Sequence, residues 1–126
     1  MTGQPDIAIA RVYDRPQTPG RARLLVDRLW PRGISKVELA PDDWLRDIAP
    51  SNELRKWFGH DPVRWAEFRT RYRSELDAEP EAVAHALDWC RRGPVTLLYS
   101  AHDREHNQAV VLQEYLTDSL EKRTAG

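Results

Sequence analysis

The 126-residue chain has one cysteine, one methionine and no long apolar run. A single cysteine excludes an internal disulfide and a metal site built from cysteine pairs. The longest purely apolar runs, Ile7–Ala10 and Ala109–Leu112, are far shorter than the ~20 residues of a membrane-spanning helix. We therefore expect no membrane association. The first residues lack the basic start and apolar stretch of a secretion signal, so we expect a cytoplasmic protein.

Neither sign of charge is in excess. The 19 basic and 20 acidic residues give a net charge of −1, which argues against a nucleic-acid-binding protein. Hydrophobic residues make up 40% of the chain, enough for one packed core, and the length is that of one domain. We therefore expect residues 1–126 to form a single domain. Arginine outnumbers lysine by 16 to 3, and its planar fork suits carboxylates and phosphates.

Three segments have the composition of strands. Residues 7–13 and 23–29 are rich in β-branched and apolar side chains, and residues 95–100 are apolar on both faces, as in a central strand. With helical segments between them, they predict an α/β fold. We expect one compact domain with a small, mainly parallel sheet of three or more strands, flanked by about five helices. The connection over residues 14–22 is too short for a helical crossover, which leaves an antiparallel pairing of the first two strands open.

Helix start and stop signals fill the rest of the chain. Asp42 or its neighbour begins a short helix that Pro50 ends. Tryptophans at four positions fall inside helical patterns, which favours a role in the core or in helix docking. These are Trp44, Trp57, Trp65 and Trp89. The further expected helices run from Ser51 to Gly59, from Asp61 to about Leu76, from Pro80 to Gly93 and from Ala109 to about Lys122.

Several strings of the sequence are specific enough to indicate a family. RVYD begins at Arg11, LVDRLWPRGISK at Leu25, APSNELRKW at Ala49 and TLLYSAHDREHNQAVVL at Thr96. In these strings, over nearly the whole chain, the sequence resembles the YeaO-like branch of the domain-of-unknown-function 488 family. The resemblance implies a compact cytoplasmic bacterial α/β protein and implies no activity. Relatives usually have a histidine where this chain has Gln108, so any catalytic role of that histidine would be lost here.

The first candidate site is the polar loop that leads from the last strand into the last helix. In open α/β sheets, ligands bind beyond the carboxyl ends of the strands, where helix N-termini favour anions. Ser100 and Asn107 lie there and are candidates for orienting a ligand. The alternative is that Asn107 or Asp103 only caps the helix. His102 and His106 are four residues apart, but two histidines alone do not predict a metal site, and we expect no metal or cofactor.

The second candidate site is Asp27 with the arginines that follow it. Asp27 is expected in the middle of a strand, where a carboxylate is costly unless it is paired. We predict that it accepts hydrogen bonds or pairs with an arginine from outside its strand. Arg28 and Arg32, in a turn-rich basic segment, suit an oxyanion. The alternative is an ion-pair network with a downstream group of acids, Asp42, Asp43 and Asp47.

The third candidate site is the end of the first strand, Tyr13-Asp14-Arg15. If the first and last strands are parallel, Tyr13 and Asp14 approach Ser100 and Asn107. Asp14 is then a candidate base, and Arg15 a candidate contact for an anion. The alternative is that Asp14 only caps the loop.

Cys90 does not fit a reactive thiol. It falls near the carboxyl end of a helix, on the apolar face of Val83 and Leu87. A reactive thiolate is favoured instead at a helix N-terminus or beside cations. We expect a buried and unreactive side chain.

These candidates favour a binding protein. The leading hypothesis is binding of an anionic small molecule that bears phosphate or carboxylate. The second is a small enzyme that uses Asp14 or Asp27 as acid or base in the same cleft. The third is a protein-interaction module, or a homodimer, formed through the tryptophan-rich helical middle. The expected ligand contacts are Arg15, Arg28, Arg32, Ser100 and Asn107.

Overall fold

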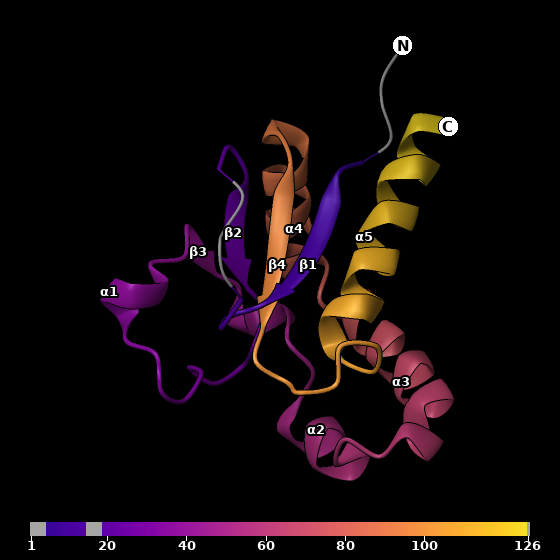
Figure 1. Ribbon diagram of the computed structural model, residues 1–126. Helices are drawn as coiled ribbons and strands as arrows, with labels where there is room; N and C mark the ends of the chain where they lie inside the picture. Colours follow the sequence, from indigo (N-terminus) through magenta and orange to yellow (C-terminus); the bar gives the residue numbers. More distant parts are fainter. Residues whose placement is uncertain (1–4, 15–18, 126) are drawn as a thin grey trace.

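The computed structural model describes residues 5–14 and 19–125, which form an α/β fold around a four-stranded parallel sheet (Figure 1). The strand order is β1-β4-β2-β3. The strands are β1 (Ile7–Arg11), β2 (Ala22–Leu25), β3 (Asp43–Trp44) and β4 (Val95–Tyr99). The helices are α1 (Lys36–Leu39), α2 (Asn52–Phe58), α3 (Trp65–Asp77), α4 (Pro80–Arg92) and α5 (Gln108–Ala125), with 3-10 turns at Arg46–Ile48 and Pro62–Arg64. The predicted fold class is confirmed.

The central strand is β4, as its apolar sequence predicts. All five of its side chains are buried. β1 pairs with one edge of β4 and β2 with the other, so Val95 lies opposite both Ile7 and Ala22. An antiparallel pairing of the first two strands is therefore wrong. A strand that is apolar on both faces needs a hydrogen-bonded neighbour on each side, and the first two strands take these two places.

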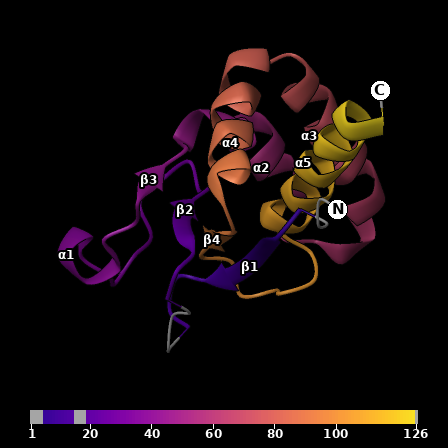
Figure 2. The same cartoon turned by 90° about the horizontal axis from the view of Figure 1, so that it is seen from above.

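The sheet separates two apolar clusters. On one face, Leu24 and Leu97 pack with the buried residues of α2, α3, α4 and α5. On the other face, Leu25 and Leu98 pack with Leu39 of α1 and with half-buried side chains of the loop before it. Figure 2 shows α3, α4 and α5 gathered on one side of the sheet and α1 apart from them, beyond β3. The chain therefore leaves β2 toward one face and β4 toward the other.

The second strand is shorter than its composition predicts. It ends at Leu25, so Asp27 lies after the strand and not in its middle. The reason is the lack of partners. β3 pairs only with Leu24 and Leu25, and the last backbone bond to β4 comes from Val26 N–H to the Leu98 carbonyl at 3.0 Å. After Val26, the described residues make no further backbone-to-backbone bond between this chain segment and β3 or β4.

The helix expected between Asp42 and Pro50 is also wrong. The segment forms β3 and a 3-10 turn instead, so Trp44 is in a strand. Its backbone bonds go to β2. The Asp42 N–H donates to the Arg23 carbonyl and the Leu45 N–H to the Leu25 carbonyl, each at 2.8 Å. These ladder bonds take the place of the helical ones.

Most of the helix signals are confirmed. Ser51 caps α2 through a bond from the Leu54 N–H, and Gly59 ends it with a left-handed φ of 52°. Asp61 begins the turn that leads into α3. The short helix α1 was not predicted, although the sequence contains its capping box, in which Ser35 and Glu38 bond to each other's backbone. Within residues 5–14 and 19–125, no helix combines the length and apolarity needed to cross a membrane.

The outer edge of β1 is covered at both ends. Gln113 of α5 donates to the Ile7 carbonyl at 2.6 Å. At the other end, the Arg11 N–H donates to Asp14 at 2.9 Å, and the Asp14 N–H donates to the Arg11 carbonyl at 3.0 Å. Side chains and a tight turn thus take the place of a neighbouring strand at both ends of this edge.

Cys90 gives the first testable prediction. It packs half-buried against the main core, and burial raises the pKa of its thiol to about 11. The thiolate is therefore scarce at neutral pH, and we expect slow alkylation of the folded protein. The check is the labelling rate with iodoacetamide, with and without denaturant. Equal rates in the two conditions would contradict it.

Candidate functional site

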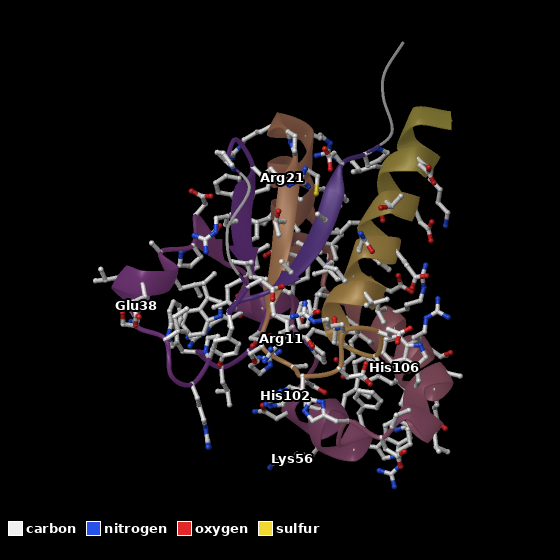
Figure 3. The ribbon with its side chains drawn as sticks, viewed as in Figure 1. Arg11, Arg21, Glu38, Lys56, His102 and His106 are labelled. Atoms are coloured by element: carbon white, nitrogen blue, oxygen red, sulfur yellow. The ribbon has the colours of Figure 1, made fainter. Side chains whose placement is uncertain are left out.

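The strand order makes the carboxyl ends of β2 and β4 a candidate ligand site. These two strands are parallel neighbours, and the chain leaves their carboxyl ends toward opposite faces of the sheet. Such a switch point opens a crevice at the strand ends, and it is where open α/β sheets bind ligands. In Figure 3, Arg11 and His102 lie at this edge and Arg21 lies at the opposite one.

Asp27 lies at this switch point. The side chain follows β2 and is only 9% exposed. Its Oδ2 accepts a hydrogen bond from the Ser100 hydroxyl and its Oδ1 accepts one from the Gln108 amide, each at 2.5 Å. The prediction that Asp27 accepts hydrogen bonds from outside its strand is confirmed. The donors are a hydroxyl and an amide, not an arginine.

The environment shifts the acidity of Asp27 upward. Burial raises the pKa of its carboxyl, and the bonds from Ser100 and Gln108 oppose that rise only in part. The guanidinium of Arg55 in α2 is near enough to favour the ionised form. A carboxyl with a raised pKa is chemically able to take or give a proton nearer neutrality. Gln108 has no proton to exchange, so it holds Asp27 without relaying anything.

The pKa of Asp14 is shifted in the opposite direction. Both of its carboxylate oxygens accept bonds from the Arg104 guanidinium, at 2.8 and 3.0 Å. This pair lowers the pKa of Asp14. A carboxylate held in its ionised form by a bidentate arginine is a weak base. The geometry therefore favours Asp27 over Asp14 as the reactive carboxylate.

The end of β1 meets β4 through a different residue than the sequence predicts. Arg11, rather than Tyr13, contacts Ser100, with its guanidinium donating to the Ser100 and Ala101 carbonyls at 3.3 and 2.9 Å. The Tyr13 hydroxyl instead donates to the Arg32 carbonyl at 2.6 Å. This bond brings the β1 end and the loop after β2 together.

The three predicted arginines fall in three different places. Arg28 donates to the Pro50 and Ala49 carbonyls, both at 3.0 Å, and lines a separate cavity of about 210 Å³. The Arg32 side chain is exposed and makes no bond with the described residues. Arg15 lies outside the described residues. Their role as ligand contacts stays a prediction, but Arg28 is held by backbone carbonyls.

Among the described residues, the alternative ion-pair network does not hold Arg28 or Arg32. Asp42 accepts a bond from the Arg23 backbone N–H at 2.7 Å. Asp43 accepts bonds from His85 and Trp89, at 2.7 and 3.0 Å. Both aspartates therefore bond at the β3 edge of the sheet, Asp42 to β2 and Asp43 to α4.

Asn107 caps α5. It is 2% exposed, its Oδ1 accepts from the Val110 N–H at 3.2 Å, and its Nδ2 donates to the Asp103 carbonyl at 2.9 Å. These bonds match the capping alternative. Asn107 positions the helix start so that the next residue, Gln108, reaches Asp27.

The histidines of this loop do not form a metal site. His106 bonds to Asp103 at 2.9 Å and stands edge-on to the Trp65 ring, whereas His102 is exposed. Within the described part of the chain, no three histidine, cysteine, aspartate or glutamate side chains gather as metal ligands.

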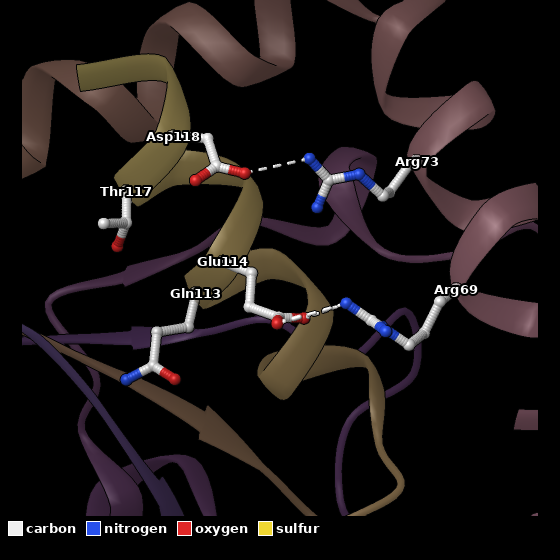
Figure 4. A pocket seen from close by; sticks show the side chains of 6 residues that line it. All are labelled: Arg69, Arg73, Gln113, Glu114, Thr117 and Asp118. Carbon is white, nitrogen blue, oxygen red and sulfur yellow. Dashed lines mark hydrogen bonds and ion pairs between the residues drawn. The ribbon is translucent and has the colours of Figure 1, made fainter. Parts of the chain in front are cut away.

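A larger hollow, of about 480 Å³, lies away from the strand ends, between α3 and α5 (Figure 4). Arg69 bonds to Glu114 there at 3.0 Å, and Arg73 bonds to Asp118 at 3.1 Å. Each arginine is thus neutralised by an acid of the other helix. These pairs join the helices and do not favour a charged ligand.

Three residues of the site carry no clear signal in the sequence. Arg55 lies on an exposed helical face, where a basic residue is ordinary. Arg104 and Gln108 belong to a loop with many polar residues, and only the fold shows which of them meet Asp14 and Asp27. The family resemblance implies a histidine at the position of Gln108, which is the one feature of the sequence that singles this residue out.

Comparison with known proteins gives a consistent result. Residues 6–126 match a family described as the inactive DUF488-N3 subclade. The chain is 44% identical over 111 residues to the uncharacterized protein YeaO of Escherichia coli K12, covering 88% of this chain and 96% of YeaO. It is 36% identical over 116 residues to the uncharacterized protein Rv3073c of Mycobacterium tuberculosis H37Rv, covering 92% and 98%. No solved structure gives a significant match.

The raised pKa of Asp27 predicts a pH-dependent stability. The folded protein holds this proton at higher pH than the unfolded chain does, so Asp27 contributes less stability as pH rises through that window. We expect Asp27→Asn to gain stability relative to the wild type as the pH rises above about 4, as measured by urea unfolding. Asp14→Asn is the control of opposite sign. Because the pKa of Asp14 is lowered, the wild type should lose stability relative to this variant as the pH falls below about 4. Parallel curves for wild type and Asp27→Asn would refute this.

The bonds of Arg28 predict a structural role. Arg28→Ala removes two charged hydrogen bonds to carbonyls and should lower the free energy of unfolding by about 2–3 kcal/mol. The matched control is Arg32→Ala, whose exposed side chain should change it by less than about 0.5 kcal/mol. Chemical denaturation of both variants measures the difference. Equal stabilities would show that the carbonyl bonds are dispensable.

Proposed function

Since this chain belongs to the inactive DUF488-N3 subclade, we propose that it binds a small anionic molecule and does not transform it. The proposed site lies around Asp27, at the carboxyl ends of β2 and β4. The observation that carries the proposal is Asp27, a nearly buried carboxylate that two side chains hold at the switch point of the sheet.

The bonds of Asp27 do not use all of its acceptor positions. A carboxylate offers about four, and the donors in the fold are the Ser100 hydroxyl, the Ser100 backbone N–H and the Gln108 amide. A ligand that brings an N–H or O–H group would complete this set. Burial of Asp27 makes such a bond stronger than it would be in water.

Arginines near Asp27 and Asp14 supply the attraction for an anion. Arg32 is exposed at the end of the loop that Tyr13 holds. Arg55 lies within electrostatic reach of Asp27, and Arg104 pairs with Asp14 at the surface. An arriving phosphate or carboxylate would meet Arg32 directly and could share the guanidinium of Arg104. We therefore assign the anion contacts to these three arginines and leave Arg28 out.

Binding is favoured over catalysis for two reasons. The side chain next to Asp27, Gln108, is neutral and cannot relay a proton, and the pKa of Asp14 is lowered by Arg104. The description of the matched family as inactive agrees with this. Asp27 alone, with its raised pKa, would be the acid or base of the alternative enzyme.

The test is calorimetry with inorganic phosphate and with citrate at low ionic strength. We expect binding that weakens as salt is added. Arg32→Gln should weaken it about tenfold, because a charged hydrogen bond is worth roughly 1.5 kcal/mol or more. Arg91→Gln, in the last turn of α4 just before β4 begins, makes the same charge change at the opposite edge and should have no effect. No binding of either anion at millimolar concentration would reject the proposal.

A further inference from the structure

Apolar side chains are exposed at the carboxyl edge of the sheet. Among the described residues, four large apolar side chains are exposed, and two of them, Tyr13 at 40% and Leu29 at 60%, follow β1 and β2 at the carboxyl edge. Leu29 is two residues after Asp27. Tyr13 is linked to the site by Arg11, whose guanidinium lies 4.9 Å from the ring centre and also bonds to the Ser100 carbonyl. A ligand with an apolar face would cover these two side chains.

The edge therefore combines three kinds of contact. Asp27 accepts hydrogen bonds, the Tyr13 ring and the Leu29 side chain offer flat and apolar surface, and the arginines attract an anion. Inorganic phosphate or a small dicarboxylate would use only the arginines. A fatty acid would use the arginines and the apolar surface, but it has no donor for Asp27. A nucleotide has all three parts, because its ribose carries hydroxyl donors and its base is a planar ring.

We infer that the ligand is a nucleoside 5′-phosphate, with ribose hydroxyls on Asp27, the base against Tyr13 and Leu29, and the phosphate among the arginines. This inference rests on the proposed anion site and names the class of its ligand. A buried carboxylate at a strand end is a suitable acceptor for ribose hydroxyls. An aromatic ring stacks on any base, so the inference does not choose among bases. The net charge of −1 fits a single nucleotide better than a polynucleotide.

The experiment compares three ligands by calorimetry on the full chain: inorganic phosphate, ribose 5-phosphate and adenosine 5′-monophosphate. We expect the dissociation constant to fall at each step, with the nucleotide at least about tenfold tighter than ribose 5-phosphate. If ribose 5-phosphate and adenosine 5′-monophosphate bind equally, the nucleotide inference is overturned and the anion site stands. If none of the three binds, both are overturned.

Variants of Tyr13 test the base contact. Tyr13→Ala should remove the advantage of the nucleotide over ribose 5-phosphate and leave the affinity for ribose 5-phosphate unchanged. Tyr13→Phe is the matched control, because it keeps the ring and loses only the bond to the Arg32 carbonyl. An equal loss in both variants would overturn the stacking contact.

The ribose contact is tested without any change to the fold. In the wild type, 2′,3′-dideoxyadenosine 5′-monophosphate should bind at least about fivefold more weakly than adenosine 5′-monophosphate, because it lacks the hydroxyls that would reach Asp27. Asp27→Asn should reduce this ratio toward one. Equal affinities of the two nucleotides for the wild type would overturn the contact.

Discussion

The burial of β4 constrains the rest of the structure. All five of its side chains are buried, so its backbone N–H and C=O groups need hydrogen-bond partners from the chain itself. β1 and β2 supply them from either side, in parallel. The carboxyl ends of three strands therefore meet at one edge of the sheet. Because the chain leaves β2 and β4 toward opposite faces, Asp27 and Ser100 are left facing each other between them.

The sequence predicts those parts of the fold that depend on local patterns. The buried strand over residues 95–99 and the caps at Ser51 and Gly59 depend on patterns within a few residues, and they were predicted correctly. The end of β2 and the form of the Asp42–Pro50 segment depend on each other, because each is the hydrogen-bond partner of the other. Composition alone cannot show where such a pairing stops.

The candidate site shows the same limit for charged side chains. The need of Asp27 for hydrogen bonds follows from its apolar neighbours, but its donors are 73 and 81 residues away in the chain. Arg28 is adjacent to Asp27 and bonds to carbonyls in another part of the molecule. Asp14 and Asp27 are both strand-end acids, yet Arg104 and burial shift their pKa values in opposite directions. The pKa and the hydrogen bonds of a charged side chain depend on its neighbours in the folded protein, and many of these are distant in the sequence.

The covered edge of β1 has a consequence for the behaviour of the protein at high concentration. An open edge strand is a template on which another chain can add a strand, and this is a common start of aggregation. Gln113 and the turn at Asp14 already bond to the outward backbone groups near both ends of β1. Only the middle of a five-residue strand remains for an incoming chain. Two side-chain bonds thus keep the sheet from growing beyond its own molecule on this side.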